Sequence, residues 1–180
     1  MSVFVYNRFV ASLALMSMAA AVVLLLPPVR RSLRRTGFGD LATWLAVLVA
    51  LAATAGSLIY SEWFGFEPCR LCWYQRIAMY PLVPVLAVGA IRRDPAIRFY
   101  GLPLSLVGAG IAIWHYLLQT FPGLDTGACS VGVPCTAKYV NEFGFVSIPL
   151  MALSAFALIS VLLLSFRPGT PVTPPEEIDG

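Results

Sequence analysis

The sequence predicts an all-α integral membrane protein, a four-helix transmembrane bundle core with an additional N-terminal transmembrane helix. Of its 180 residues, 59% are hydrophobic and only 12% are charged, whereas soluble domains average about 45–50% and about 25%. Five long uncharged stretches alternate with short polar segments. The net charge is only +3, and the arginines form short clusters rather than a stripe. A nucleic-acid-binding protein is therefore excluded as the leading interpretation.

The uncharged stretches are candidate spanning helices, because about 20 apolar residues cross a bilayer. Four are long enough unaided: 9–29, 41–61, 99–120 and 143–166. The fifth, 77–91, has 15 uncharged residues between Arg76 and Arg92. At about 1.5 Å per residue it falls short of a hydrocarbon core about 30 Å thick. We therefore expect this helix to begin near residues 69–73, which places Arg76 inside the membrane edge, where a charge needs a partner or a wet cavity.

The first segment, residues 1–40, is open to two interpretations. Three alanines at 19–21 could serve the cleavage site of a signal peptide, but such a peptide carries its positive charge before the apolar run. Here one arginine precedes the run and four follow it. We favour a retained helix with its N-terminus outside, followed by an Arg-rich cytoplasmic loop. The last segment, 167–180, is rich in proline and acidic residues, so we expect a disordered cytoplasmic tail.

The basic residues also set the orientation of the bundle. If the spans alternate, eight arginines fall on one side and four basic residues on the other. The arginine-rich side is then cytoplasmic. Both cysteine pairs, Cys69 with Cys72 and Cys129 with Cys135, lie outside, where disulfides form and persist.

Cys69 and Cys72 form a C-x-x-C motif at the start of the expected helix. Unpaired backbone N–H groups and the helix dipole stabilise a thiolate there, and the spacing closes a readily exchanged disulfide. Arg76 lies one turn after Cys72, where its guanidinium can hold a thiolate or another anion. Two alternatives stay open. Unequal cysteine spacings disfavour a zinc site, and the charge within the span disfavours a purely structural disulfide.

The second cysteine pair lies in a loop rich in small residues: Gly123, Gly127, Gly132 and Pro134. We expect this loop to be mobile and solvent-facing, with the Cys129 sulfur open to attack by the thiol of another protein. Its flanking apolar residues, Val131, Val133, Phe143 and Phe145, indicate that the loop rests on the membrane interface, where it could meet the first pair.

His115 and Gln119 lie on one face of the preceding span. His115 is expected roughly 9 Å below the outer surface, at a depth comparable to that of Arg76. Polar groups commonly tie membrane helices together. Polar groups at matching depth beneath a reactive thiol instead favour a ligand site.

These residues resemble the DsbB family of disulfide-bond formation proteins, and more closely its short-loop subgroup, disulfide formation protein C. The resemblance covers about residues 41–166, the expected redox core. It rests on C-x-x-C-W-Y-Q-R at 69–76, W-H-Y-L-L-Q at 114–119 and F-V-S-I-P at 145–149. Two features depart from it. Residues 1–40 precede the family's four-helix core, and only five residues separate the second cysteine pair.

The resemblance implies an enzyme, a protein dithiol:quinone oxidoreductase of the bacterial cytoplasmic (inner) membrane. A reduced thioredoxin-fold, DsbA-like oxidase would attack the Cys129–Cys135 disulfide at Cys129, and Cys135 would be the resolving cysteine. The Cys69–Cys72 pair would take the electrons. Cys72 would pass them to ubiquinone or menaquinone, and the quinone site would include Arg76, His115 and Gln119. No metal ion is expected.

Two alternatives to this function remain. A vitamin K epoxide reductase-like enzyme also links a C-x-x-C to a quinone, but its motif is expected toward the end of the bundle. A non-enzymatic membrane subunit would use its cysteines only as structural disulfides.

Overall fold

The structure, a computed structural model, describes residues 2–35, 37–124, 129 and 133–165. Its elements are α1 (Val3–Leu25), α2 (Pro27–Arg35), α3 (Gly39–Leu58), the π-helical turn η1 (Ile59–Trp63), α4 (Arg70–Arg92), α5 (Ile97–Thr120), the 3-10 turn η2 (Pro122–Leu124) and α6 (Ile148–Ser165). Within these residues, strand pairing is limited to one isolated bridge between Glu142 and Val146.

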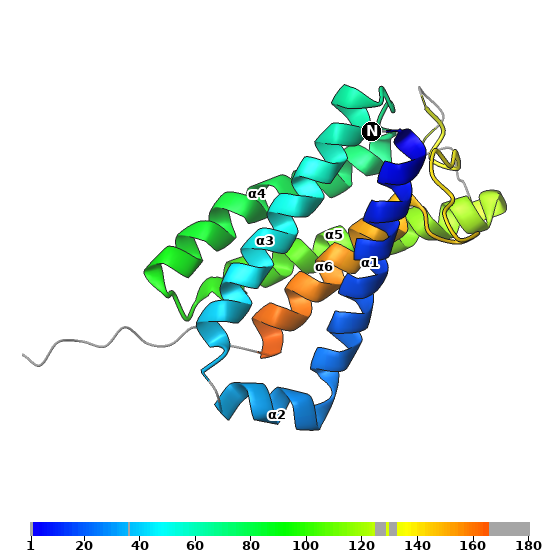
Figure 1. The fold of residues 1–180 in the computed structure, drawn as a ribbon. Helices are drawn as coiled ribbons and strands as arrows, with labels where there is room; N and C mark the ends of the chain where they lie inside the picture. Colours follow the sequence, from blue (N-terminus) through cyan, green and yellow to red (C-terminus); the bar gives the residue numbers. More distant parts are fainter. Residues whose placement is uncertain (1, 36, 125–128, 130–132, 166–180) are drawn as a thin grey trace, which may run out of the picture.

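Five helices of the described chain are long and apolar enough to cross a membrane: α1, α3 continued by η1, α4, α5 and α6. They run side by side as a bundle, whereas α2 lies across one end of it (Figure 1). Neighbours in the bundle are α3 with α4, α4 with α5, α5 with α6, and α6 with both α1 and α3. The predicted class, an all-α membrane bundle with an added N-terminal helix, is confirmed.

Helix α4 begins before Arg76, as the short uncharged run at 77–91 predicted. Cys69 is its N-cap, so Arg76 lies within the second turn instead of before the helix. The helix is 23 residues long, which at about 1.5 Å per residue spans roughly 34 Å and suffices for a bilayer. The prediction that the C-x-x-C opens this helix is confirmed.

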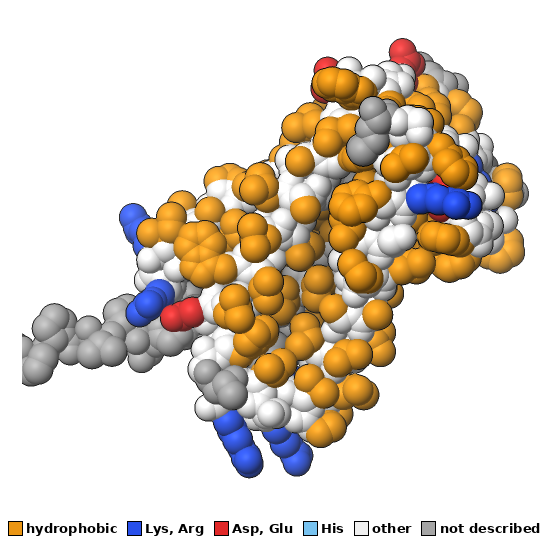
Figure 2. All heavy atoms as spheres, in the orientation of Figure 1, with side chains coloured by type: hydrophobic (Ala, Val, Ile, Leu, Met, Phe, Trp, Pro, Cys, Tyr) orange, Lys and Arg blue, Asp and Glu red, His pale blue; other side chains and the backbone are white. Residues whose placement is uncertain are grey.

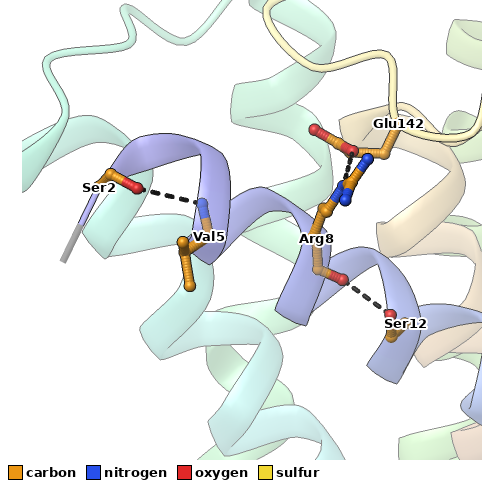
Figure 3. Close-up of polar contacts among 5 residues, drawn as sticks. All are labelled: Ser2, Val5, Arg8, Ser12 and Glu142. Atoms are coloured by element: carbon orange, nitrogen blue, oxygen red, sulfur yellow. Dashed lines mark hydrogen bonds and ion pairs between the residues drawn. The ribbon is translucent and has the colours of Figure 1, made fainter.

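Helix α1 begins earlier than the uncharged stretch suggested. The hydroxyl of Ser2 accepts a hydrogen bond from the backbone N–H of Val5 at 3.4 Å and caps the first turn (Figure 3). Arg8 therefore lies inside the helix, where its guanidinium forms an ion pair with Glu142 at 3.6 Å (Figure 3).

The Arg-rich segment after α1 is helical, not the loop expected from the sequence. Pro27 and Pro28 open α2, because proline is favoured in a first helical turn, where its missing N–H is not needed. Arg34 Nε donates to the backbone oxygen of Ser165 at 2.7 Å. This bond satisfies a carbonyl at the C-terminal end of α6 and ties α2 to the bundle.

The two ends of the bundle differ in chemistry. The start of α4, the end of α5 and the start of α6 meet at one end, with the cysteine-bearing loop (Figure 1). Arginine side chains project at the opposite end, while hydrophobic side chains cover most of the face between (Figure 2). Because the spans alternate, seven of the eight arginines expected to be cytoplasmic lie at the end opposite the cysteines: Arg30, Arg31, Arg34, Arg35, Arg92, Arg93 and Arg98. Arg167 and the predicted tail 167–180 lie outside the described residues.

Close helix packing supports the core beside the site. Phe156 of α6 is fully buried against α5, and a Cβ at Gly108 would overlap its ring. Ser105 Oγ donates to the backbone oxygen of Phe156 at 2.9 Å and lies 2.9 Å from Ser160 Oγ. Small and hydroxyl-bearing residues thus let α5 and α6 approach and bond to each other, as is typical of membrane helices.

Candidate functional site

The two cysteine pairs lie together at one end of the bundle. Cys69, Cys129 and Cys135 belong to one buried cluster, with Cys72 packed against it. Cys129 and Cys135 form a disulfide with a Cα–Cα distance of 5.7 Å. Cys69 and Cys72 are free thiols whose sulfurs are 3.0 Å apart. The expected meeting of the loop pair with the first pair is confirmed.

The predicted exposure of Cys129 is wrong. Cys129 is 3% exposed and Cys135 is fully buried, because both pack among Leu71 and Leu118 from the ends of α4 and α5. Gly127 and Gly132, which supported that prediction, and Val131, which supported a loop resting on the membrane interface, lie outside the described residues. A thiol must approach the sulfur that it attacks, and in this structure the Cys129 sulfur is covered.

His115 of α5 connects the two cysteine pairs. Its Nε2 lies 3.6 Å from Cys69 Sγ and 3.1 Å from the backbone oxygen of Cys135. A carbonyl only accepts, so Nε2 carries the proton and donates. Nδ1 then accepts from Gln75 Nε2, which is 3.1 Å away. Gln75 therefore holds the imidazole in the tautomer that points an N–H at Cys69.

Three donors converge on Cys69. Besides His115, they are the backbone N–H of Cys72 at 3.4 Å and the Cys72 thiol at 3.0 Å. The hydrogen bond from the Cys72 thiol, with a smaller contribution from His115, lowers the pKa of Cys69 well below the ordinary value of a thiol, although burial opposes the shift. The direction of this shift favours the thiolate on Cys69, with the Cys72 thiol as its hydrogen-bond donor.

Arg76 reaches toward α3. Its Nε donates to Ser57 Oγ at 2.9 Å, and its Nη2 donates to the backbone oxygen of Ser57 at 3.0 Å. The guanidinium carbon also lies 5.3 Å from the centre of the Trp73 ring, within cation–π range. Two of the five guanidinium N–H groups are used on Ser57, so the cation is fixed at the membrane edge with donors left for an anion or a carbonyl.

A cavity of about 540 Å³ opens beside this arginine. Cys72, Gln75 and Arg76 of α4 line one end of it. The remaining wall is mostly apolar and comes from α1, α3, η1, α4 and α6, with residues 66–68 and Tyr139 from the connecting segments. Cys69, His115 and Gln119 instead line a separate, small hollow under the loop, and Cys72 borders both spaces. The structure thus brings Cys72 and Arg76 to the large cavity and keeps His115 and Gln119 away from its wall.

Gln119 supports the loop. Its Nε2 donates to the backbone oxygen of Ala137 at 2.9 Å, two residues beyond Cys135. This bond holds the chain that follows the second cysteine pair against α5.

Tyr60 and Tyr80 line the large cavity, and their hydroxyls are buried without a hydrogen-bond partner among the described residues. Tyr60 is only 5% exposed, and a buried hydroxyl without a partner is costly. The sequence indicated Tyr80 only as one of several aromatic residues that could line a ring-binding pocket, and it did not single out Tyr60, Gln75 or Ser57. Ser57 at the end of α3 and Tyr60 in η1 are three residues apart, a spacing that places two residues on one helix face and could have indicated this pair.

The side chains around the inner cysteine pair could also bind a metal ion. The ligand atoms of Cys69, Cys72 and His115 lie within 4.8 Å of one another. Structural zinc sites close with four ligands, and the described residues bring three together here.

Comparisons with known proteins fit this arrangement. The family model "Disulfide bond formation protein DsbB" matches residues 39–166. Disulfide bond formation protein C of Bacillus subtilis is 48% identical over 123 residues, which cover 68% of this chain and 87% of that protein. Probable disulfide formation protein C of Halalkalibacterium halodurans is 47% identical over 125 residues, 69% of this chain and 89% of that protein. No solved structure gives a significant match.

Proposed function

Because this chain belongs to the DsbB family of disulfide bond formation proteins, we propose that it reoxidises an extracytoplasmic thioredoxin-fold oxidase and passes the electrons to a membrane quinone. Its place is the bacterial cytoplasmic membrane, with both cysteine pairs outside. The charge distribution supports this orientation, because arginines gather at the end opposite the cysteines (Figure 2).

The first steps are thiol–disulfide exchanges. A thiolate of the partner attacks Cys129, the Cys129–Cys135 bond breaks, and Cys135 leaves as a thiolate. The second partner thiol then attacks the mixed disulfide, so the partner gains a disulfide and this chain gains the Cys129 and Cys135 thiols. The same exchange with a Cys69–Cys72 disulfide moves the two electrons inward. That transfer leaves the outer pair as a disulfide and the inner pair as two thiols.

His115 serves the inner transfer. Its Nε2–H lies between Cys69 and the backbone of Cys135, so it stabilises a thiolate on Cys69 when that sulfur is the leaving group. Gln75 keeps the donor in place. The proposed role of His115 is therefore in thiol exchange and proton placement rather than direct contact with the quinone.

The residues around the large cavity fit a quinone. The hydroxyls of Tyr60 and Tyr80 lack partners, Arg76 has donors to spare, and the two carbonyl oxygens of a quinone accept hydrogen bonds. The volume of about 540 Å³ lies within the range of small-molecule sites, about 300–1,000 Å³. When bound, the quinone is the final oxidant and takes up two electrons and two protons as it becomes the quinol.

This chain's residues complete the reaction at Cys72. Cys72 borders the cavity, and its sulfur lies 3.0 Å from that of Cys69, so the pair is placed to form a disulfide. Forming that bond breaks the S–H bond of Cys72 and releases its proton and two electrons, which the quinone would take up. Arg76 stabilises negative charge that develops at this end of the cavity. The apolar walls exclude water from it.

The observation that carries the proposal is that Cys72 borders both the cysteine cluster and the cavity. The test mixes the purified protein with a reduced thioredoxin-fold partner and ubiquinone or menaquinone, and follows the quinone absorbance. We expect partner-dependent quinone loss, abolished by Cys72→Ser and preserved in Gly110→Ala, a change into open space. Undiminished turnover with Cys72→Ser would sink the proposal. The vitamin K epoxide reductase-like alternative is disfavoured because the C-x-x-C opens α4 rather than coming late in the bundle.

A further inference from the structure

Helix α1 lies outside the residues that match the family model, which begin at residue 39, yet it is part of the bundle. Ala11, Ala14 and Ala21 are buried, and α1 packs against α6. Small side chains allow such close helix contacts in membranes. Tyr6 and Arg8 then fasten its first turns, through the Gly56 backbone oxygen at 3.4 Å and the ion pair with Glu142 (Figure 3).

The same helix supplies a wall of the large cavity. From α1 come Tyr6, Phe9, Val10, Leu13, Ala14 and Ser17. The opposite wall comes from α3, and the two helices diverge away from the cysteine end with α6 behind them (Figure 1). Along α3 the lining extends from Ser57 to Leu45, roughly 18 Å at the helical rise of about 1.5 Å per residue.

The cavity changes character along this length. Its charged lining residues, Glu67 and Arg76, are both at the cysteine end, together with Cys72 and the partnerless hydroxyl of Tyr60. Toward Leu45 the wall is made of aliphatic side chains and small residues. A molecule that fits this gradient has a polar head with hydrogen-bond acceptors and a long apolar tail.

We propose that α1 makes the tail-binding wall of the quinone site, and that the isoprenoid side chain of the quinone lies between α1 and α3 with its ring beside Cys72 and Arg76. This inference rests on the proposed function, since it names where the rest of the same electron acceptor binds. A quinone is the expected occupant because the apolar part of the cavity is continuous with the end that Cys72, the thiol to be oxidised, borders. A phospholipid acyl chain is the competing occupant.

The test places a bulky side chain on the α1 wall of the cavity, in the full-length protein. Leu13 lines the cavity and is 39% exposed, so Leu13→Trp adds bulk without entering the packed interface with α6. Met16→Trp is the matched control, because Met16 is 61% exposed and is not part of the lining. Each variant is reconstituted in nanodiscs of one defined phospholipid, and binding of a tailless and a long-tailed quinone with the same ring is measured by extraction and quantification.

We expect Leu13→Trp to weaken retention of the long-tailed quinone about tenfold, or roughly 1.4 kcal/mol. This is the loss expected when about two methylene groups of the tail are no longer buried. Retention of the tailless quinone, and of both quinones by Met16→Trp, should stay unchanged. Equal effects on both quinones, no effect on either, or loss of bound phospholipid alone would overturn the inference. If the unmodified protein neither retains nor reduces any quinone, the proposed function itself fails, which is a distinguishable result.

Discussion

Replacement of His115 by alanine tests how the inner cysteine pair is activated. The change removes the N–H that lies 3.6 Å from Cys69 Sγ and leaves the donors from Cys72 in place. Because the pKa of Cys69 is lowered first by the Cys72 thiol and then by His115, the variant should have a Cys69 pKa that is higher than in the unmodified protein but still below that of an ordinary thiol.

The size of the shift follows from the geometry. A hydrogen bond to a charged group contributes about 1.5–3 kcal/mol, and one pKa unit corresponds to about 1.36 kcal/mol. The nitrogen–sulfur distance of 3.6 Å is long, so the low end applies, and the pKa should rise by about one unit. His115→Gln restores an N–H near the same position and should recover part of the shift.

The assay is alkylation of the reduced protein by iodoacetamide over a pH series, with the extent at each cysteine read by mass spectrometry. Only the thiolate reacts, so alkylation of Cys69 persists below neutral pH and is lost as the pH falls through the lowered pKa. In His115→Ala that loss should occur at higher pH. Gln119→Ala is the control, because Gln119 bonds to Ala137 and not to a cysteine. An unchanged midpoint for His115→Ala would refute the assigned role.

Two further changes test the cavity edge and the core. Ser57→Ala removes the hydroxyl acceptor of Arg76. A hydrogen bond to a charged group contributes about 1.5 kcal/mol, so the KM for quinone should rise about tenfold, while the rate of thiol exchange with the partner stays unchanged. An equal loss of both rates would contradict this. Gly108→Ala presses on the buried Phe156 ring and should destabilise the fold by about 1–3 kcal/mol, seen as a lower thermal midpoint. Gly110→Ala meets open space and should show no such loss.

The start of α4 could be predicted because it depends on local length alone. An uncharged run of 15 residues cannot cross the membrane, so the helix had to extend back past Arg76 to the C-x-x-C. Helix α2 was missed for an equally local reason. Two prolines and four arginines are typical of a loop, whereas prolines at a first turn are compatible with a helix.

The contacts within the site depend on how the helices are rotated, which one sequence does not define. Arg76 faces Ser57 rather than Cys72, and His115 faces Gln75 and Cys69 rather than the cavity. Equal depth predicted one layer for these groups, but it could not show on which side of the cysteines each would lie.

The buried state of Cys129 was also beyond the sequence. Small residues next to a cysteine indicate a flexible chain, but coverage depends on what packs from elsewhere, here Leu71 and Leu118.

The central claim is that electrons from an external dithiol leave through Cys72 to a quinone. The most direct measurement is a single turnover in nanodiscs that hold a known amount of quinone, with reduced partner added and both products quantified. The account predicts one partner disulfide for each quinol, because each carries two electrons, and no quinol in Cys72→Ser even though the partner still reacts at Cys129. Partner oxidation without quinol in the unmodified protein, or quinol formation without Cys72, would contradict it.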